Sequence, residues 1–162
     1  MRHERKKAYQ PKKPFRTIEG IEGAAWEKLS RNAVFVLIEF YRKFNGYNRY
    51  DLSLTYREVK NKMSNTLFSR AVWQLIGYGF IDVRRFGRLE RNCSLFGLSS
   101  RWRELGHDPE KLNEIEKLLK KVESLKREPG SLKKRIEISK IRNKVLNLGK
   151  HSKVKTGGPN TW

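Results

Sequence analysis

The large apolar side chains of this chain are concentrated in one stretch, which limits where a core can form. Of the eight Phe and four Trp residues, all but one of each lie between Trp26 and Gly106. Aromatic side chains supply much of the buried area of a small core, so residues 26–106 are expected to form the folded domain. Residues 1–25 are predicted to be a flexible basic arm, residues 107–149 basic helices, and residues 150–162 a disordered basic tail.

The net charge of +20, from 37 Lys and Arg against 17 Asp and Glu, limits the partners of the chain. Such an excess favours polyanions, above all nucleic acid. The longest apolar run, Ala33 to Ile38, is too short to cross a membrane, and no secretory signal opens the chain. The single Cys93 excludes an internal disulfide. These features predict a cytoplasmic, nucleoid-associated protein with no membrane partner.

Helix-start signals divide the first half of the predicted domain. Ser30 can cap a helix whose apolar residues recur at helical spacing as far as Phe44, where Asn45 and Gly46 end it. Residues 52–54 are predicted to form a short strand. Thr55 and Glu58 have the spacing of a capping box, which predicts a helix of about two turns ending near Met63.

A second helix and two strands complete the predicted domain. Ser64 is the expected N-cap of a helix that Gly79 ends. Residues 80–84 and 93–98 alternate in hydropathy as half-buried strands do, and the glycine-bearing segment 85–92 connects them as a hairpin.

This order of elements resembles that of the bacterial winged helix-turn-helix DNA-binding proteins. The resemblance spans Trp26 to Gly106 and depends on residues 54–59 (LTYREV), 64–72 (SNTLFSRAV) and 74–81 (QLIGYGFI). The closing residues 96–99 (FGLS) followed by Trp102 are similar to modules of phage and plasmid proteins, including replication initiators. The resemblance implies a mainly α fold with a small β-hairpin wing, here followed by C-terminal helices.

The helix after Ser64 is the expected base-reading element. With Phe68, Val72 and Leu75 buried, helical geometry turns a polar stripe outward. The predicted base contacts are Asn65, Thr66, Ser69, Arg70, Trp73 and, at the border, Gln74. The predicted backbone contacts are Ser64 at the helix start and Arg84, Arg85, Arg88 and Arg91 in the hairpin. The alternative is that the polar residues are caps or solvated surface, and that Trp73 belongs to the core or to a protein contact.

The C-terminal helices carry their own signals. Asp108 and Pro109 form a helix start, and Leu112, Ile115, Leu119 and Val122 follow at the steps of a coiled-coil seam. After Pro129 and Gly130, Ser131 restarts a helix in which the same steps recur at Ile138, Ile141, Val145 and Leu148. These residues predict a helical hairpin or a homodimer interface, and the alternative is packing onto the preceding domain.

No residue pattern indicates catalysis. The three His residues are far apart, no glycine-rich phosphate loop is present, and Cys93 falls in a predicted strand as a small buried side chain. The chain is therefore expected not to be an enzyme and to have no metal, cofactor or small-molecule ligand. The predicted function is sequence-specific binding of double-stranded DNA, as a transcription regulator or replication-origin binder of a bacterium or mobile element. The alternatives are an RNA-binding or ribonucleoprotein component, with bases stacking on Tyr47, Tyr50 and Trp73, and a protein-interaction module.

Overall fold

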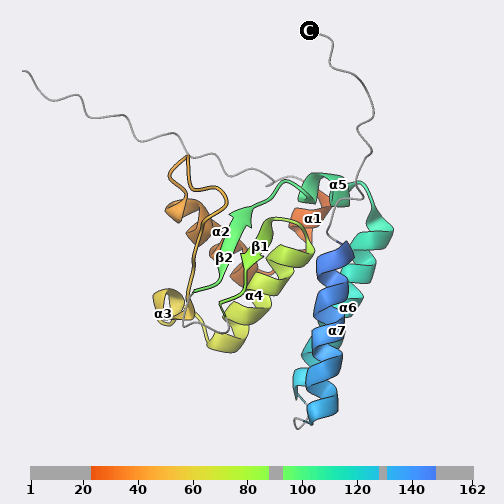
Figure 1. Cartoon of the computed structure of the whole chain (residues 1–162). Helices are drawn as coiled ribbons and strands as arrows, with labels where there is room; N and C mark the ends of the chain where they lie inside the picture. The colour runs from red at the N-terminus through yellow and green to blue at the C-terminus, as the bar shows by residue number, and fades with distance from the viewer. Residues whose placement is uncertain (1–22, 88–92, 128–130, 149–162) are drawn as a thin grey trace, which may run out of the picture.

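The chain is mainly helical, with one two-stranded antiparallel sheet, in a computed structural model that describes residues 23–87, 93–127 and 131–148 (Figure 1). This confirms the predicted class of a mainly α protein with a small β-hairpin. Most of the predicted arm, the predicted tail, and Pro129 and Gly130 lie outside the described residues. The elements are α1 Ala24–Glu27, α2 Arg31–Lys43, α3 Tyr56–Val59, α4 Asn65–Gly77, β1 Ile81–Arg85, β2 Leu95–Leu98, α5 Trp102–Gly106, α6 Pro109–Arg127 and α7 Leu132–Leu148.

The predicted N-caps of α2, α3 and α4 are confirmed. The hydroxyl oxygens of Ser30 and Ser64 accept hydrogen bonds from the third backbone N–H of their helices, each at 3.3 Å. Thr55 and Glu58 form the capping box, with the Thr55 backbone N–H donating to the Glu58 carboxylate at 2.9 Å. α3 ends at Val59, so it is a single turn and shorter than predicted.

The β-hairpin differs in detail from its sequence pattern. Ile81 is opposite Leu98 and Val83 is opposite Phe96, and the register shifts between Val83 and Arg85. The predicted strand 52–54 is reduced to a bridge at Leu52, which exchanges backbone hydrogen bonds of 2.9 and 2.8 Å with Phe96. β2 begins at Leu95, so Cys93 precedes the strand and is exposed. The prediction of a buried Cys93 is therefore wrong.

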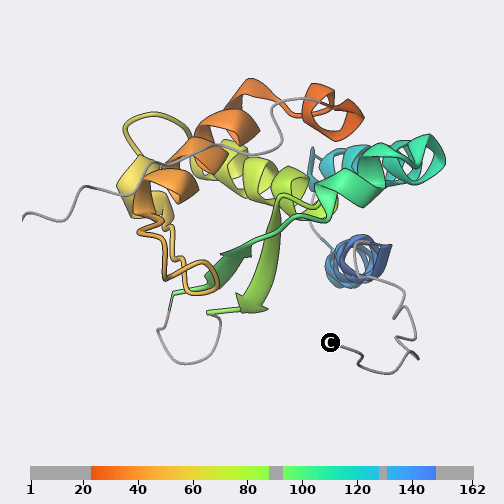
Figure 2. The ribbon, with the colours of Figure 1, turned by 90° about the horizontal axis from the view of Figure 1, so that it is seen from above.

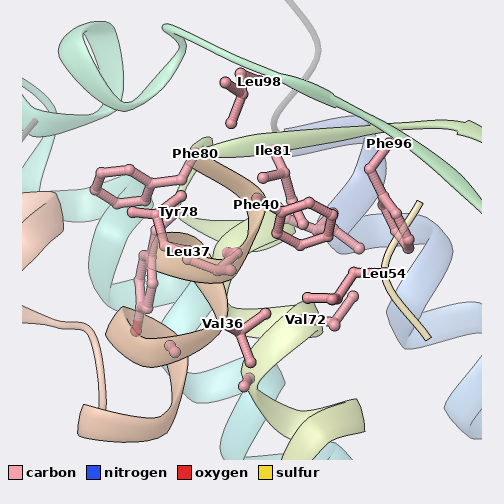
Figure 3. Packing of buried hydrophobic residues seen from close by; sticks show 14 of the residues in the cluster. Val36, Leu37, Phe40, Leu54, Val72, Tyr78, Phe80, Ile81, Phe96 and Leu98 are labelled. Atoms are coloured by element: carbon pink, nitrogen blue, oxygen red, sulfur yellow. The ribbon is translucent and has the colours of Figure 1, made fainter. Parts of the chain in front are cut away.

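The core lies between α2, α4 and the β-hairpin (Figure 3). Leu37 and Phe40 of α2, Leu75 of α4 and Ile81 of β1 are almost fully buried. The Phe40 ring meets the Phe96 ring edge to face, with the two centroids 5.4 Å apart. These contacts fix the position of α4 relative to the β-hairpin.

α6 and α7 form a helical hairpin that packs along α4 (Figures 1 and 2). The Asp108 carboxylate caps α6 by accepting from the Lys111 backbone N–H at 3.0 Å, as predicted. Leu112 and Ile115 belong to the same buried cluster as the core of residues 25–105, so the helical hairpin shares that core. Of the predicted alternatives, the structure shows packing onto the preceding domain, and a homodimer stays a prediction. None of the helices within the described ranges has the length and apolar character needed to span a membrane.

Gly77 allows this close approach of the helices. A Cβ at position 77 would lie 3.0 Å from Ile115 Cγ2 and 3.3 Å from Val145 Cγ1. A larger side chain would have to push the helical hairpin away from α4. The end of α4 is therefore held against both α6 and α7.

Candidate nucleic-acid interface

The surface of α4 is divided among three neighbours. Ala71 and Leu75 are buried in the core with α2. Thr66 and Arg70 face the helical hairpin, where both line a small cavity with residues of α6 and α7. Asn65 and Ser69 line a larger cleft beside the β-hairpin. α4 therefore does not present the single free stripe that the sequence predicts.

Arg70 and Gln74 are engaged within the chain rather than turned to open solvent. The Arg70 guanidinium forms an ion pair with Glu123 of α6. The Gln74 side-chain oxygen accepts hydrogen bonds from the Ser30 hydroxyl at 2.6 Å and the Ser30 backbone N–H at 3.3 Å. Arg70, predicted to face solvent, instead faces α6, and Gln74, predicted to border the exposed face, is bonded to the residue that caps α2.

Trp73 lies at the border between the two cavities and lines both. The guanidinium carbon of Arg142, from α7, is 4.7 Å from the centre of its ring. The Phe86 ring is stacked at an interplanar angle of 23°, with the two centroids 6.5 Å apart. The half-buried indole therefore joins α4, α7 and the β-hairpin, which agrees with the alternative of a contact within the protein.

The cavity between α4 and the helical hairpin has a volume of about 180 Å³ and gathers positive charge. Arg70, Lys126 and Arg142 line it together with Glu123. Burial lowers the pKa of Lys126, the charges of Arg142 and Arg70 lower it further, and Glu123 opposes them. The Arg70–Glu123 ion pair thus lies among other cations, in a site that holds the helical hairpin against α4.

The first turn of α4 remains open. Ser64, Asn65 and Thr66 are exposed, and Ser69 is half-buried at the edge of the cleft. The Ser64 hydroxyl is used as the cap of α4. Of the DNA-contact residues predicted on α4, these four are the ones whose side chains remain accessible.

The described arginines of the β-hairpin are also exposed. Arg84 and Arg85 lie at the end of β1, and the Arg84 guanidinium carbon is 5.2 Å from the centre of the Tyr50 ring. Arg88 and Arg91 lie outside the described residues. Phe86 and Gly87, which follow Arg85 in the chain, line the same cleft as Asn65 in the first turn of α4.

The larger cleft, here named the α4 cleft, has a volume of about 890 Å³. Figure 2 shows the β-hairpin and α7 on the same side of α4, and side chains of all three line the cleft. Those of α7 include Arg135, Ile136, Ser139 and Asn143. No pattern in the sequence assigned these α7 residues to a site. Their one signal was the spacing of residues 136, 139 and 143, which places them on one face of α7.

Comparisons with known proteins add no relative: no family model, curated protein or solved structure matches this chain. Within the described ranges, no three or more His, Cys, Asp or Glu side chains are grouped in a way that could hold a metal ion.

Proposed function

We propose that this chain binds double-stranded DNA sequence-specifically, as a transcription regulator or replication-origin binder of a bacterium or mobile element. Residues 26–106 would be its winged helix-turn-helix domain. The order of the elements supports this proposal: α2 is followed by the bridge at Leu52, by α3 and α4, and by the β1–β2 hairpin. Phe96 of β2 pairs with both Leu52 and Val83. In this arrangement α4 is the recognition helix and the β-hairpin is the wing.

The observation that carries the proposal is the open first turn of α4. Helix-turn-helix proteins contact base edges with the N-terminal residues of the recognition helix. Asn65 and Thr66 are exposed there, and Ser69 is one turn further along. An Asn side chain can pair bidentately with adenine, and Ser and Thr hydroxyls adapt to several bases. We therefore assign base contact to these three residues and not to Arg70, Trp73 or Gln74, whose half-buried side chains are engaged with other parts of the chain.

Exposed cations lie in the elements that precede and follow α4 in the chain. Arg84 and Arg85 project from the wing, while Arg57, Lys60 and Lys62 are exposed in and just after α3. Side chains of this kind hold phosphates and set the register of a duplex without reading its sequence. The proposed footprint is therefore α3, the first turn of α4, and the wing.

A second candidate function is RNA binding. The observation that favours it is the exposure of aromatic rings, since the Tyr47 side chain is 96% exposed and Tyr50 is 55% exposed. Single-stranded RNA is recognised largely by stacking its bases on such rings. A protein-interaction module is the third candidate, in which the charge serves only solubility.

Competition binding separates these functions. A labelled duplex is displaced from the full chain by unlabelled duplex DNA, single-stranded DNA or a structured RNA, and anisotropy is recorded at several salt concentrations. We expect duplex DNA to be the best competitor, and the logarithm of the association constant to fall with log salt by about 0.9 per phosphate contact. A strong RNA preference would replace the proposal with the second candidate. No polyanion binding at moderate salt would favour the third.

A further inference from the structure

We propose that the α4 cleft binds unpaired nucleotides of single-stranded DNA. This inference rests on the proposed function and extends it, because the surface that binds duplex DNA would also bind DNA in its single-stranded form. With about 890 Å³, the cleft has the size of a pocket for small ligands. A few unpaired nucleotides fit a space of this kind, whereas a base-paired helix is too wide to enter it and can reach only residues at its edge, such as Asn65 and Ser69.

The positive charge of the residues that line the α4 cleft favours a negatively charged ligand. Arg135 and Arg142 of α7 both line the cleft, and the described residues around it include no Asp or Glu. A single strand carries one phosphate per nucleotide, and grooves for such strands use cations that follow the backbone. The α7 wall therefore complements a phosphate chain.

The aromatic lining supplies a stacking surface. Phe86 is 52% exposed at the mouth of the cleft and is stacked on Trp73. Arg142 lies over the Trp73 ring, which fixes the indole while leaving the Phe86 ring accessible. Base stacking on an aromatic side chain is tolerant of sequence, because every base has a π-face. Phe86 is thus the expected platform for the first unpaired base.

Amides and hydroxyls lie on both walls. Asn65 and Ser69 line the cleft from α4, and Ser139 and Asn143 line it from α7. Once a base is unpaired, its Watson–Crick edge is free to bond with groups of this type. Because Asn65 and Ser69 also belong to the proposed base contacts of the duplex, the test uses Phe86, whose exposed ring is stacked on Trp73 in the cleft.

The test uses 15-nucleotide oligo(dT) and the full chain. Phe86→Ala is expected to weaken oligo(dT) binding at least fivefold, because it removes the stacking platform. The matched control Tyr47→Ala removes an even more exposed ring outside the cleft and is expected to change the affinity less than twofold. Because Phe86 belongs to the proposed wing, the duplex affinity of Phe86→Ala is measured as well, and its loss for duplex DNA is expected to be smaller than its loss for oligo(dT). Equal effects of the two variants on oligo(dT) would overturn the inference.

Cys93 gives an independent readout. It is the only cysteine of the chain, it is exposed, and it lines the cleft. Saturating oligo(dT) is expected to slow alkylation of the parent chain by a fluorescent maleimide at least fivefold. Unchanged alkylation in the saturated complex would mean that the strand binds elsewhere and would overturn the inference.

The failures of the two proposals are distinguishable. Duplex binding without oligo(dT) binding would overturn the cleft proposal alone, with a partner such as an acidic peptide then the better candidate for the cleft. Oligo(dT) binding with Cys93 protection but no duplex binding would overturn the proposed function alone. Tighter binding of 15-nucleotide oligo(U) than of oligo(dT) would overturn the assignment to DNA.

Discussion

Replacing Gly79 with alanine is expected to lower the free energy of unfolding by about 3 kcal/mol. Gly79 has φ +79°, a left-handed conformation that costs an L residue roughly 1–2 kcal/mol. A Cβ at this position would also lie 2.8 Å from the backbone nitrogen of Trp102 and 2.9 Å from the carbonyl carbon of Arg101. Backbone atoms cannot turn aside as a flexible side chain can, so overpacking adds roughly 1–3 kcal/mol.

Gly79 matters for function because it lies where the chain passes from α4 to β1. Its carbonyl oxygen accepts the Trp102 backbone N–H at 3.2 Å, which connects this corner to α5. Urea unfolding followed by circular dichroism measures the loss. Gly106→Ala is the matched control, since its Cβ would meet nothing within 4 Å and its φ is not positive. A Gly79→Ala variant as stable as Gly106→Ala would contradict the geometry of this corner.

Reversing the charge of Arg85 is expected to weaken duplex binding by about tenfold or more at low salt. Arg85 is exposed at the end of β1, within the β-hairpin that we propose as the wing. The change to Glu removes a phosphate contact and places a negative charge near the DNA backbone. The salt slope is expected to become shallower by about 0.9 as one contact is lost. Anisotropy titrations at three salt concentrations measure both quantities.

Lys117→Glu is the matched control for this charge reversal. It changes the net charge by the same amount, but Lys117 is exposed on α6, which lies outside the proposed duplex footprint of α3, the first turn of α4 and the wing. We expect less than a threefold loss of affinity for this variant. If Lys117→Glu weakens binding as much as Arg85→Glu, the attraction comes from overall charge, and the wing has no special role.

Local signals in the sequence predicted local structure well. The Ser30, Ser64 and Asp108 caps and the Thr55–Glu58 capping box all form, since each depends on atoms within one helical turn. The coiled-coil spacing of α6 and α7 also predicted the seam on which they meet, where Ile141 and Val145 are buried. The ends of the strands were predicted less accurately. Cys93 continues the alternation of residues 93–98 but precedes β2 and is exposed, because alternation alone does not show where the backbone pairing stops.

Contacts between distant segments decided which predicted site residues stayed accessible. Helical periodicity separates the core side of α4 from the rest, but it cannot say whether the rest meets water or another helix. Arg70 pairs with Glu123 of α6, and Gln74 bonds to Ser30 before α2. From the sequence alone, residues such as Glu123 and Ser30 cannot be distinguished from residues whose side chains are exposed to water. The α7 wall of the α4 cleft escaped prediction for the same reason.

The most direct test of the central claim, that the first turn of α4 reads DNA bases, is selection from a random duplex pool with the parent chain and with Asn65→Ala. We expect the parent chain to enrich a defined motif containing adenine. The Asn65→Ala variant should lose sequence preference at one or two adjacent positions and keep the rest, with a cost of about 1–3 kcal/mol on the parent motif. No enriched motif, or the same motif at full strength from Asn65→Ala, would show that the first turn of α4 does not read DNA bases.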